Sequence, residues 1–401
     1  MKILKSIRNW LLWCGRVFAR EWNIVLHDQG IIVFFVLLPL MYPIVYTLIY
    51  NPEVLRKIEV VVVDQDRTAR SRRLVRDASA APVFKVYDYA PDMAAARRII
   101  NENKAYAILY IPENFGKKIG RFENAHATLY VEMSLLLRYR DLMASVTEVQ
   151  LKDINDITAE RKDMVGLPAQ NLGGLPVDNR AHMLGDTEQG FASFIMPGII
   201  VLILQQAMLL GICMLGGTAH ERRRRNGGVD PLQLNAAPLS ATVWGRTLCY
   251  FTFFVPFVIW ILHWVPELFS LPHSGSAVQY LVFIAPMLLA TGFFGQTVNG
   301  IVTDRESSFI IVVVSSVLFL FLTGLTWPRY ASPDIWKVVG DFVPAVWGVQ
   351  GFISINSCGG TIATNVTQYL WLWGLTAVYF VTSMLTLRYV AYRARRKYGR
   401  G

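Results

Sequence analysis

The segment GIIVFFVLLPLMYPIVYTLIY, residues 30–50, has no charged side chain and is long enough to cross a bilayer as one helix. Comparable apolar segments recur near 191–215, 247–264, 278–302, 309–325 and 369–387. Between the first and the second lies a predominantly polar segment of 140 residues, 51–190. The pattern predicts a polytopic α-helical membrane protein of six spans with an inserted, separately folded α/β domain.

Charge placement predicts the topology. Residues 51–190 contain 20 Lys/Arg and 20 Asp/Glu, so the net charge of +10 comes from the rest of the chain. Basic residues gather in the N-terminal segment, the 218–246 loop and the C-terminal tail, whereas the 265–277 loop has none. This positive-inside bias places both termini in the cytoplasm and residues 51–190 in the periplasm. The basic surplus is thus a topology signal, and we expect no nucleic-acid partner.

The N-terminal segment, residues 1–29, is predicted to be an amphipathic helix. Its apolar side chains recur at helical spacing: Ile3, Ile7, Trp10, Leu11, Cys14, Val17 and Phe18. Basic side chains take the opposite side, which suits a helix lying in the cytoplasmic interface against membrane lipid. Such a helix could serve as an anchor only, or could also touch a cytoplasmic partner.

The 51–190 domain alternates strand-like and helix-like segments. Strands are predicted at 58–64, 83–89, 105–112 and 127–133, and helices at 68–79, 91–103, 113–120 and 135–164, before a Gly/Pro-rich return at 166–176. This alternation predicts an α/β layer domain. The domain has no cysteine, so we expect it to fold without disulfides.

The second half of the chain is predicted to be mostly membrane-embedded. After span 2 (191–217) come the cytoplasmic loop 218–246, spans 3–5 within 247–325, and a segment at 326–368 broken by Pro and Gly. That segment suits external, partly re-entrant helices, and span 6 with its basic tail follows at 369–401. Four amide side chains fall inside spans, namely Gln205, Gln206, Gln296 and Asn299. They either join helices or line a translocation path.

No phosphate-binding loop, metal-ligand motif or nucleophile motif occurs in the sequence, so we expect no catalysis, metal or cofactor in this chain. The 218–246 loop holds the richest pattern. Its four arginines, 222–225, are explained by topology alone, and His220 is expected to be a solvated loop residue. The following VDPLQLNAAPLS, residues 229–240, is predicted to be a short helix capped by Asp230, with Pro231 in its first turn. That favours a docking element.

These segments together resemble a known family. REWNIVLHDQG (20–30), VVVVDQDRTARSRRLV (60–75), AYAILYIPENFGKKI (105–119) and the 220–246 loop are similar, in order and spacing, to membrane (permease) subunits of type-2 ATP-binding-cassette exporters with a large external domain after span 1. The resemblance assigns ATPase coupling to Glu21, Asp28, Glu221, Arg222, Leu232, Leu234, Pro238 and Leu239. Arg223 stands where the family usually has a second acidic residue.

The resemblance implies a dimer of permeases, formed by two copies or by related paralogues, in the bacterial inner membrane. Separate cytoplasmic ATPase subunits would bind ATP and Mg²⁺. A hydrophobic or amphiphilic substrate, such as a drug or lipid, would leave through a path between the permeases. Whether a periplasmic adaptor takes part is left open.

Two other function classes compete with this interpretation. One is a membrane-anchored sensor or assembly scaffold whose external domain binds a ligand or an envelope partner. Five clustered spans with no following signalling domain count against it. The other is an ion-coupled secondary transporter, which would be expected to carry carboxylates within its spans. The six predicted spans contain none.

Overall fold

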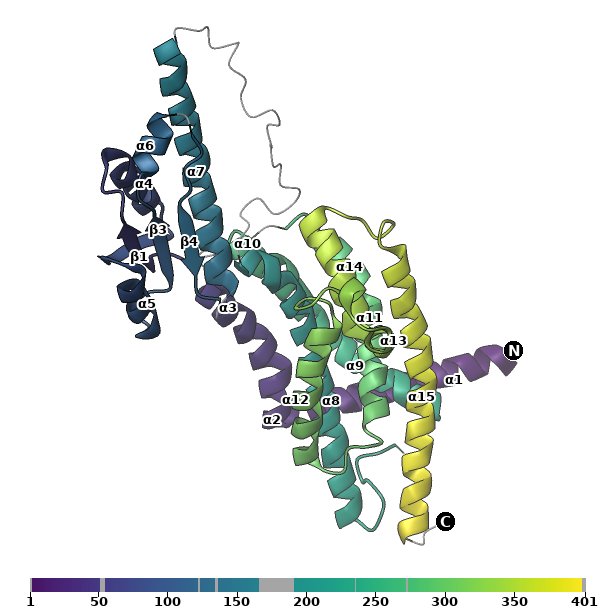
Figure 1. Ribbon diagram of the computed structural model, residues 1–401. Coiled ribbons are helices and arrows are strands. Elements are labelled where there is room, and N and C mark those ends of the chain that lie inside the picture. The colour runs from purple at the N-terminus through teal and green to yellow at the C-terminus, as the bar shows by residue number, and fades with distance from the viewer. Residues whose placement is uncertain are drawn as a thin grey trace. The chain divides into compact units, whose positions relative to one another are not determined.

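The computed structural model describes residues 2–50, 55–121, 123–133, 136–165, 191–234, 236–271 and 273–398. The chain divides into two compact units (Figure 1). The helical unit comprises Met1–Asn51 and Met183–Gly401, and the α/β unit comprises Pro52–His182. The predicted Gly/Pro-rich return at 166–176 lies outside the described residues.

The α/β unit is built on a four-stranded mixed sheet. Its elements are β1 (Ile58–Asp64), α4 (Ala69–Ala80), β2 (Phe84–Tyr89), α5 (Met93–Asn101), β3 (Ala107–Ile111), α6 (Phe115–Gly120), β4 (Thr128–Val131) and α7 (Leu136–Val165). The strand order is β2-β1-β3-β4; β1 pairs in parallel with β2 and β3, and β4 runs antiparallel to β3. The strands and helices lie where the alternation of the sequence predicted them.

Helices cover both faces of this sheet. Val60 and Val62 of β1 point into a core with α4, α6 and α7, whereas Val61 and Val63 point into a second core with α5. All four valines are fully buried. A strand that is covered on both faces reads as an uninterrupted apolar segment, which is why 58–64 was recognisable from the sequence.

The helical unit contains six helices that are long and apolar enough to span a membrane, among the residues that the structure describes. They are α2–α3 (Gln29–Ile32, a π-helical turn Val33–Leu37, and Leu38–Tyr50), α8 (Phe191–Arg225), α9–α10 (Leu239–Ile259, a π-helical turn Trp260–Trp264, and Val265–Leu268), α11 (Ala277–Val298), α12 (Arg305–Leu322) and α15 (Val366–Tyr398). Six described helices thus agree with the six spans predicted from the sequence, and the count rises to seven if the bent pair of helices at 334–341 and 344–358 is one span.

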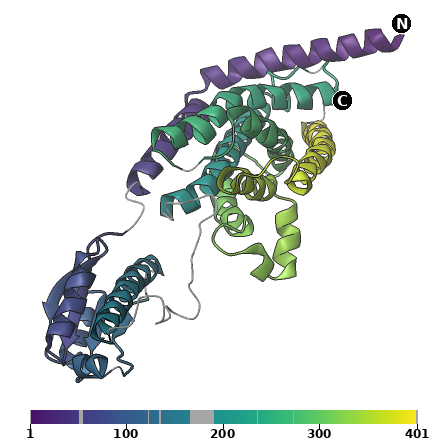
Figure 2. The same cartoon turned by 90° about the horizontal axis from the view of Figure 1, so that it is seen from above.

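Two further helices, α13 (Asp334–Asp341) and α14 (Pro344–Cys358), are apolar enough only when taken together, as a broken span or a re-entrant loop. A single 3₁₀ turn (Arg329–Ala331) precedes α13, and α14 follows it at a bend of 93°. α1 (Lys2–His27) runs alongside α9 in Figure 2. Cys14, Val17 and Val25 of α1 are buried, whereas Ile7 and Leu11 of the predicted apolar face are more than half exposed. The predicted amphipathic helix therefore packs on α9 from Trp10 onward, where the Trp10 indole donates to the Ser240 hydroxyl at 3.0 Å.

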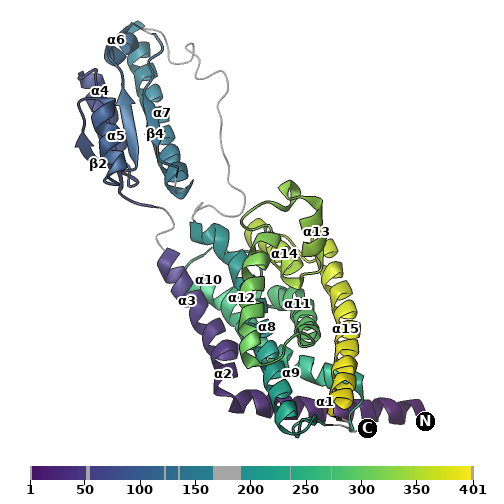
Figure 3. The same cartoon turned by 60° about the horizontal axis from the view of Figure 1, so that its bottom comes forward.

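α8 is the central helix of the unit and packs against α11, α12, α14 and α3 (Figure 3). It is buried over most of its length, and its side chains Val201, Leu204, Met208 and Ile212 are fully enclosed. Fully buried aromatic rings from the neighbouring helices, among them Phe35, Phe254 and Phe283, complete the core. A helix that is apolar all round belongs at the centre of such a bundle.

Three boundaries predicted from the sequence are wrong. α8 continues to Arg225, so residues 218–225 of the predicted loop are helical and His220 is a half-buried helix residue. α11 ends at Val298, which makes Asn299 its C-cap residue rather than part of a span. The predicted helix at 229–240 is absent: the described residues of 226–238 form turns. Gly227 and Gly228, both at positive φ, end α8, and Pro238 precedes α9.

Candidate functional site: a polar network joining helix ends

A buried carboxylate joins α1 to α9. Glu21 is only 6% exposed, and its Oε1 accepts a 2.5 Å hydrogen bond from the hydroxyl of Tyr250. Its Oε2 lies 3.5 Å from Nε of Arg246, one helical turn before Tyr250. Because a buried carboxylate needs partners of this kind, the contact fixes α1 on the first half of α9.

A second ion pair joins the start of α2 to the start of α12. Arg305 donates from Nη1 to Asp28 Oδ2 at 2.9 Å and from Nη2 to Oδ1 at 2.6 Å, which is the bidentate geometry of a strong pair. Asp28 also caps α2 by accepting from the backbone N–H groups of Gly30 and Ile31. The backbone N–H of Arg305 in turn donates to Oε1 of Glu221, at 2.9 Å.

Glu221, to which the resemblance assigned ATPase coupling, therefore has a hydrogen-bond partner inside the chain. Its contact ties the C-terminal part of α8 to the first residue of α12, which Asp304 caps in a capping box with Ser307. The N–H of Ser307 donates to the Asp304 carboxylate and lowers the pKa of that group below its ordinary value. These contacts use the free N–H groups at the beginning of α12.

The turns at 226–238 are held by charge pairs instead of by a helix. Asp230 is 4% exposed and accepts from Nε and Nη2 of Arg222 at 3.1 and 3.3 Å. The same carboxylate accepts from the N–H of Leu232, and Arg223 donates to Gln233. Asp230 thus pairs with a cation and holds a turn, and does not cap a helix as its place before Pro231 suggested.

Two glycines permit the close approach of these elements. A Cβ on Gly217 would lie 2.5 Å from the Asp304 carbonyl oxygen, and a Cβ on Gly245 would lie 2.8 Å from the Cys14 carbonyl oxygen. Both obstacles are backbone atoms, which cannot rotate away. Any larger residue would push α8 from the start of α12, or α1 from α9.

An open groove borders this network. It has a volume of about 600 Å³, and its lining includes Asn23, His27, Asp28, Arg222, Leu232 and Arg305. Leu232 is 41% exposed, and Leu239 at the start of α9 is 40% exposed. Leu234 is half-buried and Pro238 is exposed. The groove thus combines one exposed leucine, Leu232, with charged groups in its lining.

The amides in and beside the spans make contacts within the helical unit. Gln296 donates to Thr247 Oγ1 at 2.7 Å and to the Val243 carbonyl at 3.2 Å, and so joins α11 to α9. Gln205 is fully buried and accepts from Thr291 at 3.5 Å. Both side-chain polar atoms of Gln206 are buried without a partner among the described residues. These positions favour helix joining for Gln296. Besides Gln206, Nε2 of Gln205 and Oδ1 of Asn299 are also buried without a partner among the described residues.

Asn299 and His220 form a second junction, between α8 and the C-cap of α11. The Asn299 side chain donates to the Ile212 carbonyl at 3.3 Å, and the backbone carbonyl oxygen of Asn299 lies 3.1 Å from Nε2 of His220. Small cavities of about 40 and 30 Å³ adjoin Asn299, Gln296 and Arg246. Each has room for one to a few waters.

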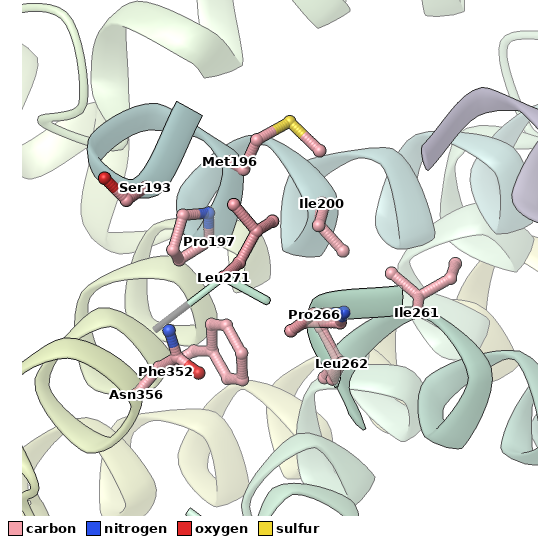
Figure 4. A pocket seen from close by; sticks show the side chains of 10 residues that line it. All are labelled: Ser193, Met196, Pro197, Ile200, Ile261, Leu262, Pro266, Leu271, Phe352 and Asn356. Carbon is pink, nitrogen blue, oxygen red and sulfur yellow. The ribbon is translucent and has the colours of Figure 1, made fainter. Parts of the chain in front are cut away.

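Figure 4 shows a further cavity, between α8, α10 and α14. Its lining is largely apolar, with Met196, Ile200 and Phe352 beside the polar Ser193 and Asn356. Its volume is about 10 Å³, so it holds about one water molecule. It is too small to receive a substrate.

The network joins residues that the resemblance assigned to one function, namely Glu21, Asp28, Glu221, Arg222 and Leu232. The sequence profile of the ABC-2 family transporter proteins matches residues 30–385. The chain belongs to the ABC-2 family of transporters. As an ABC-2 permease it is a multi-pass membrane component of an ABC transporter, and an ATPase partner is implied. No curated protein matches the chain in sequence.

Sequence reasoning missed two members of this ABC-2 network. Tyr250 is a hydroxyl-bearing residue one turn after Arg246 inside an apolar span, a spacing that places both on one helix face. Arg305 follows Asp304 in the short segment between spans 4 and 5, where a single basic residue is explained by topology alone. Its pairing with Asp28 spans 277 positions of sequence, which no local pattern reveals.

Proposed function

We propose that this ABC-2 permease is the membrane subunit of an exporter. Two permeases, served by separate cytoplasmic ATPase subunits, would move a hydrophobic or amphiphilic substrate out of the cytoplasm or the inner membrane. Family membership supports the transporter class, and the interfacial position proposed for α1 supports an ATPase docking at that end of the spans.

The polar network is the observation that carries this proposal. Glu21–Tyr250 and Glu21–Arg246 link α1 to α9, Asp28–Arg305 links α2 to α12, and Glu221–Arg305 links α8 to α12. A partner that displaces the 226–238 turns or α1 would therefore move the ends of several spans together. Coupling requires such a contiguous physical connection between the docking surface and the moving elements.

The translocation path is proposed to lie between two permeases. The cavities that adjoin Gln296, Asn299 and Met196 inside the helical unit measure only about 10 to 40 Å³. One side of α12, in contrast, exposes large apolar side chains: Ile310, Val313, Val314, Val317 and Phe321. A second permease or lipid would cover that side.

The docking assignment is tested with Leu232→Ala and Leu239→Ala, purified with the ATPase subunit in nanodiscs. Each leucine is expected to anchor the ATPase, and loss of an anchor costs about 2 kcal/mol or roughly thirtyfold in affinity. Leu268→Ala is the matched control, because Leu268 is 66% exposed on α10, away from the network.

The measurements are co-purification of the ATPase and ATP hydrolysis. We expect both to fall for Leu232→Ala and Leu239→Ala and to stay unchanged for Leu268→Ala. If Leu232→Ala and Leu239→Ala both bind the ATPase and support ATP hydrolysis as the wild-type protein does, these leucines do not dock the ATPase.

A further inference from the structure

The α/β unit contains a large cleft on the sheet face that α4, α6 and α7 cover. Its volume is about 530 Å³. Its apolar lining comes from five elements and includes Leu74, Leu109, Phe115, Ile119, Leu129 and Val146. The unit's larger apolar core, around Val60 and Val62, continues into this lining.

A space of this size is unusual for an interior that only serves folding. Protein cores are close-packed and hold few voids larger than a water molecule. Pockets for small organic molecules, in contrast, measure about 300–1,000 Å³ and combine apolar walls with a few polar groups. The cleft of the α/β unit has the size and the composition of the second class.

Among the charged side chains that line the cleft, the arginines are already engaged, whereas two carboxylates have no ion-pair partner among the described residues. Arg73 is engaged by Asp156 at 2.5 Å and by Asp77 at 3.8 Å, and Arg70 has interactions of its own. Asp153 and Glu123 also line the cleft, and neither forms an ion pair with another described residue. Burial, followed by the neighbouring Asp77, raises the pKa of Asp153 above its ordinary value, and Arg73 opposes that shift. A cation placed beside Asp153 would remove this penalty.

We propose that this cleft binds a hydrophobic cation, with its apolar body against Leu109, Phe115 and Leu129 and its positive charge beside Asp153. The apolar walls supply affinity through buried surface, and the carboxylate of Asp153, which forms no ion pair with another described residue, selects the sign of the charge. This site lies wholly within the α/β unit and does not depend on the exporter function proposed above.

Equilibrium dialysis of the full chain in lipid nanodiscs tests the proposal, with empty nanodiscs as the reference. The probes are tetraphenylphosphonium and tetraphenylborate, which have nearly the same shape and opposite charge. No ATP or ATPase is present, so the result is independent of export. We expect saturable binding of tetraphenylphosphonium in excess of the empty nanodiscs, and no such excess for tetraphenylborate.

Two variants locate the site. Asp153→Asn should weaken tetraphenylphosphonium binding about tenfold, whereas Asp88→Asn, at an exposed carboxylate of β2, should leave it unchanged. Ala125→Trp places an indole in the cleft and should abolish binding, with Ala94→Trp on the exposed side of α5 as its control. If Ala125→Trp fails to fold, the Asp153→Asn variant still tests whether the probe binds in the cleft.

Three results would overturn the proposal. The first is tetraphenylphosphonium binding no greater than in empty nanodiscs. The second is equal binding of both probes, which would refute the selection of a cation. The third is wild-type binding by Asp153→Asn, or by a folded Ala125→Trp protein, which would place the probe elsewhere.

Discussion

Charged side chains carry the contacts between elements at the polar end of the helical unit. Glu21, Asp28 and Asp230 are each at least half-buried, and each has a cation from a different element or from the far side of a turn. Removing one partner of such a pair leaves the other charge without compensation, which costs more than an exposed pair contributes. A single substitution in one of these pairs should therefore destabilise the contacts at several helix ends.

Arg305→Gln tests this at the pair with Asp28, where the side chains are 32% and 18% exposed. The change keeps the backbone N–H that binds Glu221 and removes both charged hydrogen bonds. We expect a loss of about 1–3 kcal/mol, because Asp28 remains partly buried without its cation. The thermal unfolding midpoint of the purified permease should fall accordingly.

The control for that experiment is Arg224→Gln, since Arg224 is exposed at the end of α8. A double-mutant cycle with Asp28→Asn isolates the pair, and we expect a coupling energy of about 1–2 kcal/mol. Equal unfolding midpoints for Arg305→Gln and the wild-type protein would show that the pair contributes nothing to stability.

At the scale of elements, the crossing of α1 and α9 depends on a small residue. Gly245→Val would place side-chain atoms against the Cys14 carbonyl and Val17, so α1 should separate from α9. Overpacking of this kind costs about 1–3 kcal/mol. The thermal unfolding midpoint of the permease should fall, and the coupling of ATP hydrolysis to transport should weaken.

Gly374→Val in α15 is the matched control, because a Cβ on Gly374 meets nothing within 4 Å. It carries the same change in helix propensity without the steric clash. If both valine variants unfold at the same temperature, close approach at Gly245 is not what holds α1 in place.

Elements with a strong repeating pattern were predictable, whereas contacts between distant elements were not. Uninterrupted apolar segments predicted the six candidate spans, and Val60–Val63 predicted strand β1. An element that is buried on all sides has a continuous apolar sequence, which is easily recognised. The prediction of a helix at 229–240 was wrong because an Asp before a Pro can cap a helix but can equally accept an ion pair, and Asp230 pairs with Arg222. Glu21 was chosen by resemblance, but its partner Tyr250 is 229 residues away and became visible only in the fold.

At the scale of the whole molecule, loop charges predict which side of the membrane each segment occupies. Residues 51–190 are neutral with 20 charges of each sign, whereas the segments next to the polar network are basic. Lys and Arg in short loops are retained on the cytoplasmic side, and long domains are translocated largely regardless of charge. The network end of the spans should thus face the cytoplasm, where an ATPase could dock, and the α/β unit should face the periplasm.

Single cysteines in a background without the four native ones test this topology. Lys104→Cys reports on the α/β unit, where Lys104 is exposed, and Asn226→Cys reports on the end of α8 without removing a basic charge. A membrane-impermeant thiol reagent, added to cells whose outer membrane alone is permeabilised, should label position 104 and not position 226. Lysis should make both positions reactive, which controls for buried thiols. Labelling of 226 but not 104 before lysis would invert the topology, and the leucines at 232 and 239 would then face away from any cytoplasmic ATPase.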